Sequence, residues 1–183
     1  MINTAIEVAL EAHKNQFRKG TEIPYVTHSL AVGIILAKAG FPDEVIAAGI
    51  LHDTIEDTPV TVNELREKFG EEVAEIVDRV SEPDKSLSWE ARKQLTLDSL
   101  KETSEAVRFV VLADKLDNIR AIAGDYKAEG DGFWKRFKRG RESQKWYYRC
   151  LLNALHDGPF DDAYSFLYSQ LAQTVTEVFG EDD

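Results

Sequence analysis

The segment 49–58 has an apolar, helix-like pattern and yet contains one histidine and three carboxylates. An apolar segment is expected to be buried. Burying ionised carboxylates is costly unless a cation or a dense hydrogen-bond network compensates for the lost water. His52 and Asp53 stand side by side, and Glu56 and Asp57 follow them one helical turn later. The segment therefore predicts a metal ion before any function is considered.

Two more polar residues occupy positions that the surrounding pattern reserves for the core. His28 lies on the apolar stripe of the run 25–39, and Asp114 lies on the apolar face of the run 104–124. One inward histidine is usually no more than a hydrogen-bonded core residue. Together with the His-Asp pair of the first segment, however, these residues would supply two nitrogen and two oxygen donors to a single ion.

Length and composition bound the class of protein. A chain of 183 residues suits one domain, and no Gly-, Ser- or Pro-rich stretch divides it. Glu7 and Glu11 interrupt the N-terminus where a secretory signal would be apolar, and no run of about 18 apolar residues could cross a membrane. The single cysteine, Cys150, cannot form an internal disulfide. We expect a cytoplasmic protein; the sequence leaves a homodimer open.

The charge is unevenly distributed. The net charge of −11 argues against binding nucleic acid or an anionic membrane surface. The window 135–149, however, contains seven cationic side chains and one anionic side chain, and aromatic residues alternate with them. A charge run is often only a solvated helix face, but cations among aromatic rings also suit a phosphorylated ligand with a stackable base. The predicted partner is therefore a small nucleotide.

The pattern is helical almost throughout, so we predict an all-α bundle of about eight or nine helices. A short β-hairpin at 18–26 is compatible with this prediction. A capping box formed by Thr61 and Glu64 marks one helix start. Glycines and prolines mark the breaks, and residues 81–88 are predicted to form a loop. The expected helices are 5–17, 25–39, 43–58, 62–69, 71–80, 89–102, 104–124, 133–156 and 161–179.

Three longer strings resemble the hydrolase domain of RelA/SpoT proteins, which belongs to the HD superfamily of metal-dependent phosphohydrolases. The chain is similar in particular to the small stand-alone alarmone hydrolases of the metazoan SpoT homologue type. The strings are residues 17–28, which contain Phe-Arg-Lys-Gly and Pro-Tyr-Val-Thr-His, residues 52–58 and residues 112–120. The resemblance covers a core at 3–125. Beyond it lie a basic and aromatic segment at 131–157 and a C-terminal helix at 161–179, so the expected single HD domain spans 1–183.

The resemblance implies manganese-dependent hydrolysis of guanosine 3′,5′-bis(diphosphate) at the 3′ position, with release of pyrophosphate after attack by an activated water. It assigns the metal to His28, His52, Asp53 and Asp114. Mixed imidazole and carboxylate donors also suit Fe, Co, Zn or Ni, and donor type alone does not choose among these ions. Glu56 and Asp57 are the expected catalytic pair, which orients the water or accepts its proton.

The expected substrate contacts are cations and hydrogen-bonding groups. Arg18 and Lys19 match the basic contacts of the family. Lys85, in the predicted loop 81–88, and Arg92, in the predicted helix 89–102, are candidate phosphate contacts. Asn118 lies one turn beyond Asp114. In the basic and aromatic segment the candidates are Arg141 and Tyr147.

Two other functions remain open at this stage. One is an HD nucleotidase or phosphatase that acts on another nucleotide, such as the 2′-phosphate of NADPH or a nucleoside monophosphate. The other is a non-catalytic nucleotide sensor. A sensor would be expected to have a broken ligand set or to lack Glu56 and Asp57, and the sequence shows neither change.

Overall fold

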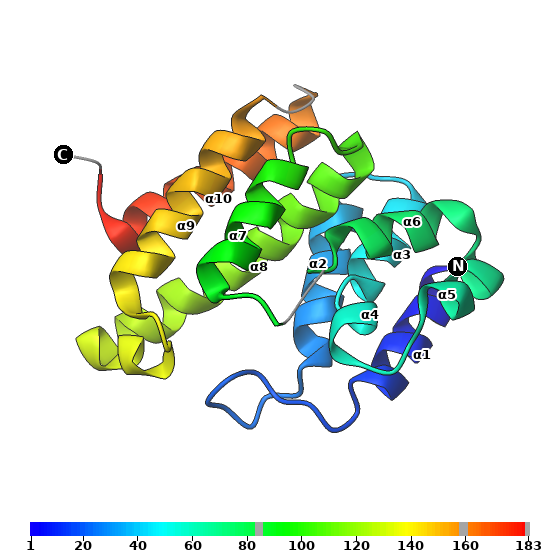
Figure 1. Cartoon of the computed structure of the whole chain (residues 1–183), viewed down its shortest axis with the longest axis horizontal. Helices are drawn as coiled ribbons and strands as arrows, with labels where there is room; N and C mark the ends of the chain where they lie inside the picture. The colour runs from blue at the N-terminus through cyan, green and yellow to red at the C-terminus, as the bar shows by residue number, and fades with distance from the viewer. Residues whose placement is uncertain (83–85, 158–160, 182–183) are drawn as a thin grey trace.

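The computed structural model describes residues 1–82, 86–157 and 161–181, and these fold almost entirely as helices (Figure 1). The prediction of an all-α fold is confirmed. The candidate contact Lys85 lies outside the described residues. The elements are α1 (Ile2–Ala12), α2 (Val26–Lys38), α3 (Asp43–Leu51), α4 (Thr54–Asp57), α5 (Val62–Phe69), α6 (Glu71–Val80), α7 (Trp89–Ser99), α8 (Glu105–Glu129), the 3-10 helix η1 (Gly130–Arg136), α9 (Gly140–His156) and α10 (Asp162–Phe179).

The predicted helix 43–58 is interrupted where the chemistry is concentrated. α3 ends at Leu51 and the single turn α4 begins at Thr54, so His52 and Asp53 lie between two helices. Side chains at this break hydrogen-bond to backbone carbonyls in the last turn of α3. The Thr54 hydroxyl donates to the carbonyl of Leu51 (2.7 Å), and His52 Nδ1 lies 2.8 Å from the carbonyl of Gly49. Such local bonds compete with the helical ladder.

The first helix is also shorter than predicted, because its expected last turn forms the hairpin-like connection to α2. The backbone N–H of Tyr25 donates to the carbonyl of Gln16, and that of Arg18 donates to the carbonyl of Ile23, each at 2.8 Å. In the described part of the chain, strand pairing consists of one antiparallel bridge, between Phe17 and Pro24. This connection brings Arg18 and Lys19 towards the start of α2.

The predicted helix 133–156 is two elements. η1 ends at Arg136 and α9 begins at Gly140, which has a positive φ of 67°. A positive φ is a conformation that glycine adopts without the steric cost that a side chain would add. The chain therefore turns between the aromatic residues of η1 and the basic start of α9. The capping box at Thr61 and Glu64 is present as predicted.

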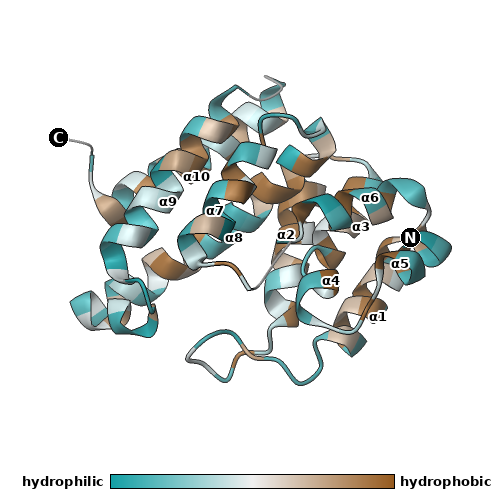
Figure 2. Ribbon diagram, viewed as in Figure 1, coloured by the Kyte–Doolittle hydropathy of each residue, from teal (hydrophilic) through white to brown (hydrophobic). Residues whose placement is uncertain are grey.

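α8 is the central helix of the fold. It packs against α2, α3 and α6 on one side and against α10 and η1 on the other. In Figure 1, α1 to α6 gather at one end of the molecule and α7, α9 and α10 at the other. The apolar stripes face inwards, as the brown segments in Figure 2 show. None of the helices in the described residues combines the length and apolarity that a membrane span requires.

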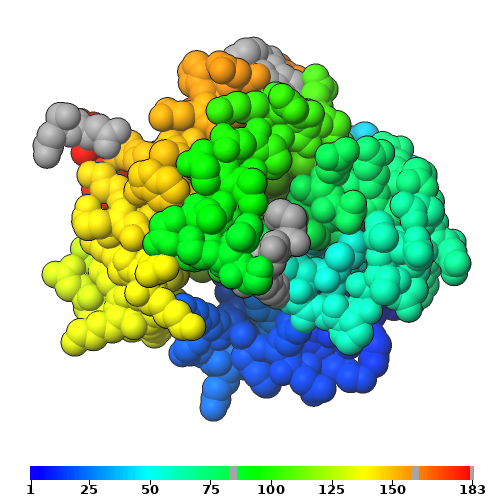
Figure 3. Space-filling model, in the orientation of Figure 1, coloured from blue at the N-terminus to red at the C-terminus, as the bar shows by residue number. Residues whose placement is uncertain are grey.

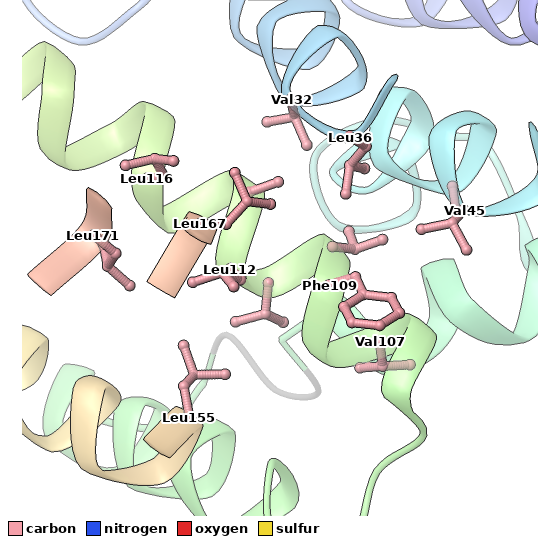
Figure 4. Close-up of a cluster of buried hydrophobic side chains, with 14 of the residues drawn as sticks. Val32, Leu36, Val45, Val107, Phe109, Leu112, Leu116, Leu155, Leu167 and Leu171 are labelled. Carbon is pink, nitrogen blue, oxygen red and sulfur yellow. The ribbon is translucent and has the colours of Figure 1, made fainter. Parts of the chain in front are cut away.

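The hydrophobic core fixes the rotation of α8. Leu112 and Leu116 are fully buried on this helix, and side chains from α2, α3, α9 and α10 gather around it (Figure 4). Each fully buried leucine contributes roughly 1.5–3 kcal/mol relative to an exposed one. Asp114, which lies between these leucines in the sequence, is 7% exposed. The rotation that the core imposes therefore holds a carboxylate inside the protein.

Two glycines allow α2 and α3 to approach closely. A Cβ atom on Gly33 would lie 2.4 Å from Cγ1 of Ile50, and a Cβ atom on Gly49 would lie 2.3 Å from Cδ1 of Leu36. Real Cβ atoms essentially never approach another heavy atom this closely, so a larger residue at either position would force its neighbour to shift. Because α2 carries His28 and α3 leads into His52, this close contact sets the separation of the two histidines.

Candidate metal and phosphate site

The residues predicted to bind a metal converge from three parts of the chain. Ligand atoms of His28 on α2, His52 after α3 and Asp114 on α8 all lie within 4.8 Å of one another. Asp114 Oδ1 is 3.2 Å from His28 Nε2 and 3.7 Å from His52 Nε2. Asp53 Oδ2 is 2.9 Å from His52 Nε2 and 3.8 Å from His28 Nε2. Two nitrogens and two oxygens therefore face a common point.

Both imidazoles are oriented as metal ligands usually are. His28 Nδ1 lies 2.6 Å from Oδ2 of Asp117, and His52 Nδ1 lies 2.8 Å from the carbonyl of Gly49. These acceptors favour a proton on Nδ1, which leaves the lone pair of Nε2 directed at the cluster. His52 Nε2 is buried and faces the carboxylate oxygens of Asp53 and Asp114. A buried nitrogen of this kind, among carboxylate oxygens, fits a bound cation.

The carboxylates are held by further side chains. The Tyr25 hydroxyl donates to Oδ2 of Asp53 at 2.5 Å. On Asp114, Asn118 Nδ2 donates to Oδ1 and Lys115 Nζ donates to Oδ2, each at 2.6 Å. The two oxygens of Asp114 thus have different surroundings: Oδ1 faces the histidines and Oδ2 faces the lysine. Such outer contacts orient the groups that bind the ion.

The cluster attracts positive charge. Burial alone would lower the pKa of His52, but Asp53 and Asp114 raise it to about 9. Burial would raise the pKa of Asp114, but Lys115 and the two histidines hold it well below the usual range. Burial would also raise the pKa of Asp53, but His52 lowers it below the usual range. Asp53 and Asp114 are therefore ionised, and a positive charge nearby stabilises them. A divalent ion supplies this charge in place of protons on the histidines.

The predicted catalytic pair faces the same place. Glu56 and Asp57 line a cavity of about 180 Å³ together with His52, Asp53 and Asp114. Two distant segments hold α4. The backbone N–H of Glu82 donates to Oε2 of Glu56 at 3.1 Å, and Gln16 Nε2 donates to the carbonyl of Asp57 at 2.7 Å. Burial raises the pKa of the Glu56 carboxyl, as is usual for a group that exchanges a proton during catalysis.

A larger cavity of about 600 Å³ adjoins the first, and it has Tyr25, Lys93, Lys115, Asn118 and Tyr147 in common with it. Its walls come from the connection before α2, from α7 and α8, and from η1 and α9. Figure 3 shows the N-terminal part, α7 and the α9 region meeting on one face of the molecule. Its cations are Arg18, Lys19, Lys93, Lys115 and Arg136, and its aromatic residues include Trp89, Phe133, Phe137, Tyr147 and Tyr148.

Four predicted substrate contacts line this larger cavity: Arg18, Lys19, Asn118 and Tyr147. Arg18 pairs with Asp117 at 3.0 Å, and Lys19 Nζ lies 5.0 Å above the ring of Phe137. The Tyr147 hydroxyl is buried without a hydrogen-bond partner in the described part of the chain, which suits a group that meets a polar ligand. The basic and aromatic segment thus contributes both aromatic rings and the cation Arg136 to the wall of this cavity.

Two predicted contacts are placed elsewhere. Arg92 pairs with Glu82 and is absent from the lining of both cavities, whereas its neighbour Lys93 lines both. Arg141 is bound to the C-terminal helix: Nη2 donates to the carbonyl of Val178 at 3.2 Å, and the guanidinium lies 5.6 Å from the ring centre of Phe179. The groups that Arg141 contacts, Val178 and Phe179, lie outside both cavities, whereas Glu82, the partner of Arg92, itself lines the smaller cavity. The roles of Arg92 and Arg141 as substrate contacts stay predictions.

The structure adds three residues to the site that the sequence interpretation left without a role. Lys115 contacts Asp114, Asp117 supports both His28 and Arg18, and Lys93 lines both cavities. The first two belong to the string 112–120 that resembles the family. Lys115 directly follows a predicted ligand, and Asp117 lies about one turn from it. Their closeness in sequence to Asp114 was the feature that could have identified Lys115 and Asp117 as site residues.

Comparison with known proteins agrees with the geometry. The sequence profile of the HD domain matches residues 5–139. The chain is 42% identical over 125 residues to the guanosine-3′,5′-bis(diphosphate) 3′-pyrophosphohydrolase MESH1 of Xenopus tropicalis, covering 67% of this chain and 69% of that protein. It is 40% identical over 121 residues to the guanosine-3′,5′-bis(diphosphate) 3′-pyrophosphohydrolase of Haemophilus influenzae, covering 63% of this chain and 18% of that protein. The chain thus spans about a fifth of some of these longer relatives.

Solved structures show the same fold. A metazoan orthologue of SpoT, described as hydrolysing ppGpp, superposes with a TM-score of 0.81 at 27% identity and covers 98% of this chain and 96% of that chain. The crystal structure of lmo0812 from Listeria monocytogenes has a TM-score of 0.76 at 36% identity, covering 84% of this chain and 99% of that one. Because the HD domain profile matches residues 5–139, about three quarters of its length, the chain belongs to the HD domain family.

Proposed function

We propose that the chain is a single HD domain that hydrolyses guanosine 3′,5′-bis(diphosphate) at the 3′ position and releases pyrophosphate. The observation that carries the proposal is the convergence of His28, His52 and Asp114, with Asp53 beside them, on the cavity that Glu56 and Asp57 also line. The relatives named for this activity support the choice of substrate.

We propose that His28, His52, Asp53 and Asp114 bind a divalent ion, and that Mn²⁺ is the preferred ion. When bound, such an ion acidifies water and neutralises charge on a phosphoryl group. Glu56 and Asp57, held by the contacts to Glu82 and Gln16, orient the attacking water and accept its proton.

The larger cavity is the proposed nucleotide site. It has a volume of about 600 Å³ and combines cations with aromatic rings. Arg18 and Lys19 lie on its N-terminal wall, and Lys93 lies on the wall formed by α7. Phosphate groups favour the cations, and a base favours the rings, through stacking and cation–π contacts. A nucleotide that carries phosphates at two positions of its ribose would use both the cations and the aromatic rings. We also propose that the enzyme is cytoplasmic.

A panel of nucleotides with product identification tests this proposal. Purified protein loaded with Mn²⁺ is incubated with the alarmone, NADPH and GMP, and the products are separated by anion-exchange chromatography. We expect pyrophosphate and GDP from the alarmone, with kcat/KM at least about tenfold above the other two substrates. One lost charge-assisted contact accounts for a factor of this size.

Other outcomes would replace the proposal with one of the alternatives. Inorganic phosphate from NADPH or GMP at a higher kcat/KM would favour an HD phosphatase. Binding of the alarmone without any turnover would favour a nucleotide sensor.

A further inference from the structure

Lys115 occupies the junction of the two cavities. It lines both of them, and its side chain is 19% exposed. It follows Asp114 directly on α8, and Nζ is 2.6 Å from Oδ2 of that carboxylate. A lysine at this place is close to the candidate metal ligands on one side and to the nucleotide cavity on the other.

The two oxygens of Asp114 face different groups: one faces the candidate metal position and the other faces Lys115. Oδ1 faces Nε2 of His28 at 3.2 Å and of His52 at 3.7 Å, whereas Oδ2 faces Lys115. A cation bound among the histidines therefore has Oδ1 available without displacing the lysine. The ammonium group keeps its place when the ion is present.

Three of the four other cations of the larger cavity have carboxylates of their own, and the fourth, Lys19, lies over the ring of Phe137. Arg18 pairs with Asp117, Lys93 pairs with Glu82, and Arg136 pairs with Asp125 and Glu129. The carboxylate that Lys115 contacts is instead one of the candidate metal ligands.

The four candidate ligands alone do not neutralise Lys115, although Glu56, Asp57 and Glu82 also line the smaller cavity. Two neutral histidines and two carboxylates carry two negative charges, which a divalent ion cancels. The ammonium group of Lys115 then has no net counter-charge from the ligand set. In a partly buried site such a charge is stabilised by an anion that can also accept a hydrogen bond.

We propose that Lys115 is a phosphate-binding residue, which holds Oδ2 of Asp114 and also donates a hydrogen bond to the phosphoryl group placed beside the ion. The inference rests on the proposed function for the identity of that group. The nearby Tyr147 hydroxyl, which has no hydrogen-bond partner among the described residues, lines the same junction and is a second donor for the same anion.

The test uses inorganic pyrophosphate as the probe, so it needs no turnover. Wild-type protein with one equivalent of Mn²⁺ is titrated with micromolar pyrophosphate by calorimetry, beside Lys115→Met, Lys115→Arg and the control Lys14→Met. Lys14 is an exposed lysine that pairs with Glu11 outside both cavities. The Mn²⁺ content of every variant is measured by elemental analysis.

We expect Lys115→Met to weaken pyrophosphate binding by about 10- to 100-fold, the range for one charge-assisted hydrogen bond, with its Mn²⁺ retained. Lys115→Arg should stay close to wild type, and Lys14→Met should match it. If Lys115→Met does not fold, Lys115→Gln gives the same comparison, because it removes the charge and keeps a donor for Asp114.

Three results would overturn the inference. The first is a wild-type protein that does not bind pyrophosphate. The second is a Lys115→Met variant that binds it as tightly as wild type. The third is a variant that loses Mn²⁺ together with pyrophosphate, so that Lys115 acts only through Asp114. A wild-type protein that binds pyrophosphate but does not hydrolyse the alarmone would contradict the proposed function alone.

Discussion

The double variant Glu56→Gln/Asp57→Asn is expected to release pyrophosphate from the alarmone about 100- to 10,000-fold more slowly than wild type, the usual contribution of general acid–base catalysis. Both substitutions keep the size of the side chain and remove the ability to accept a proton. Glu56 and Asp57 line the cavity of the candidate metal site without belonging to the His28, His52 and Asp114 cluster. The variant should therefore still bind one ion per chain.

The matched control removes two carboxylates from an exposed surface. Glu7 and Glu11 lie on the outward face of α1, so Glu7→Gln/Glu11→Gln changes the net charge by the same amount. Turnover is followed by a coupled pyrophosphate assay, and ion content by elemental analysis. Unchanged turnover in the Glu56/Asp57 variant, or an equal loss in the control, would remove the catalytic role of the pair.

His52→Gln is expected to lose the ion and, with it, turnover. His52 is 3% exposed, and its Nε2 faces Asp53 and Asp114. Glutamine fills much of the same space but is a poor ligand for transition metals. In wild type, Mn²⁺ at about 100 times its Kd should add roughly 2.7 kcal/mol to the free energy of unfolding. The variant should show almost none of this gain.

Another buried histidine provides the control for His52. His13 is 1% exposed, and its Nδ1 contacts the side chain of Gln16 outside the cluster. His13→Gln should therefore keep its bound Mn²⁺ and the rise in melting temperature on adding the ion. The measurements are thermal unfolding with and without Mn²⁺ and elemental analysis after gel filtration. If His52→Gln retained a full equivalent of the ion, the ligand assignment would fail.

Three candidate ligands that the structure brings together could be selected from the sequence because each is an exception to a strong local rule. His28 and Asp114 lie on inward helical faces, where a polar group needs a partner, and His52 stands in an apolar run. The break between α3 and α4 was missed because it leaves the periodic pattern almost intact. It arises from side-chain bonds of His52 and Thr54 to nearby carbonyls, which periodicity does not report.

The substrate contacts were harder to predict because they depend on how one helix packs on another. Arg92 and Lys93 are neighbours on α7, and the rotation of that helix decides which of them lines the cavities. Among the residues of α7, only Leu97 is buried, so the sequence pattern of the helix defines this rotation weakly. The role of Arg141 likewise depends on the position of α10, to which it is hydrogen-bonded. A cluster of cationic residues in the sequence predicts a positive surface, but it does not predict which of the side chains face the cavity.

Titration of the metal-free protein with Mn²⁺, followed by pyrophosphate release from the alarmone, tests the central claim most directly. Four side chains that share one ion predict no turnover without metal, a linear rise up to one equivalent per chain and a plateau beyond it. Turnover by the metal-free protein, or a rise that continues to two equivalents, would contradict a single divalent centre as the origin of the activity.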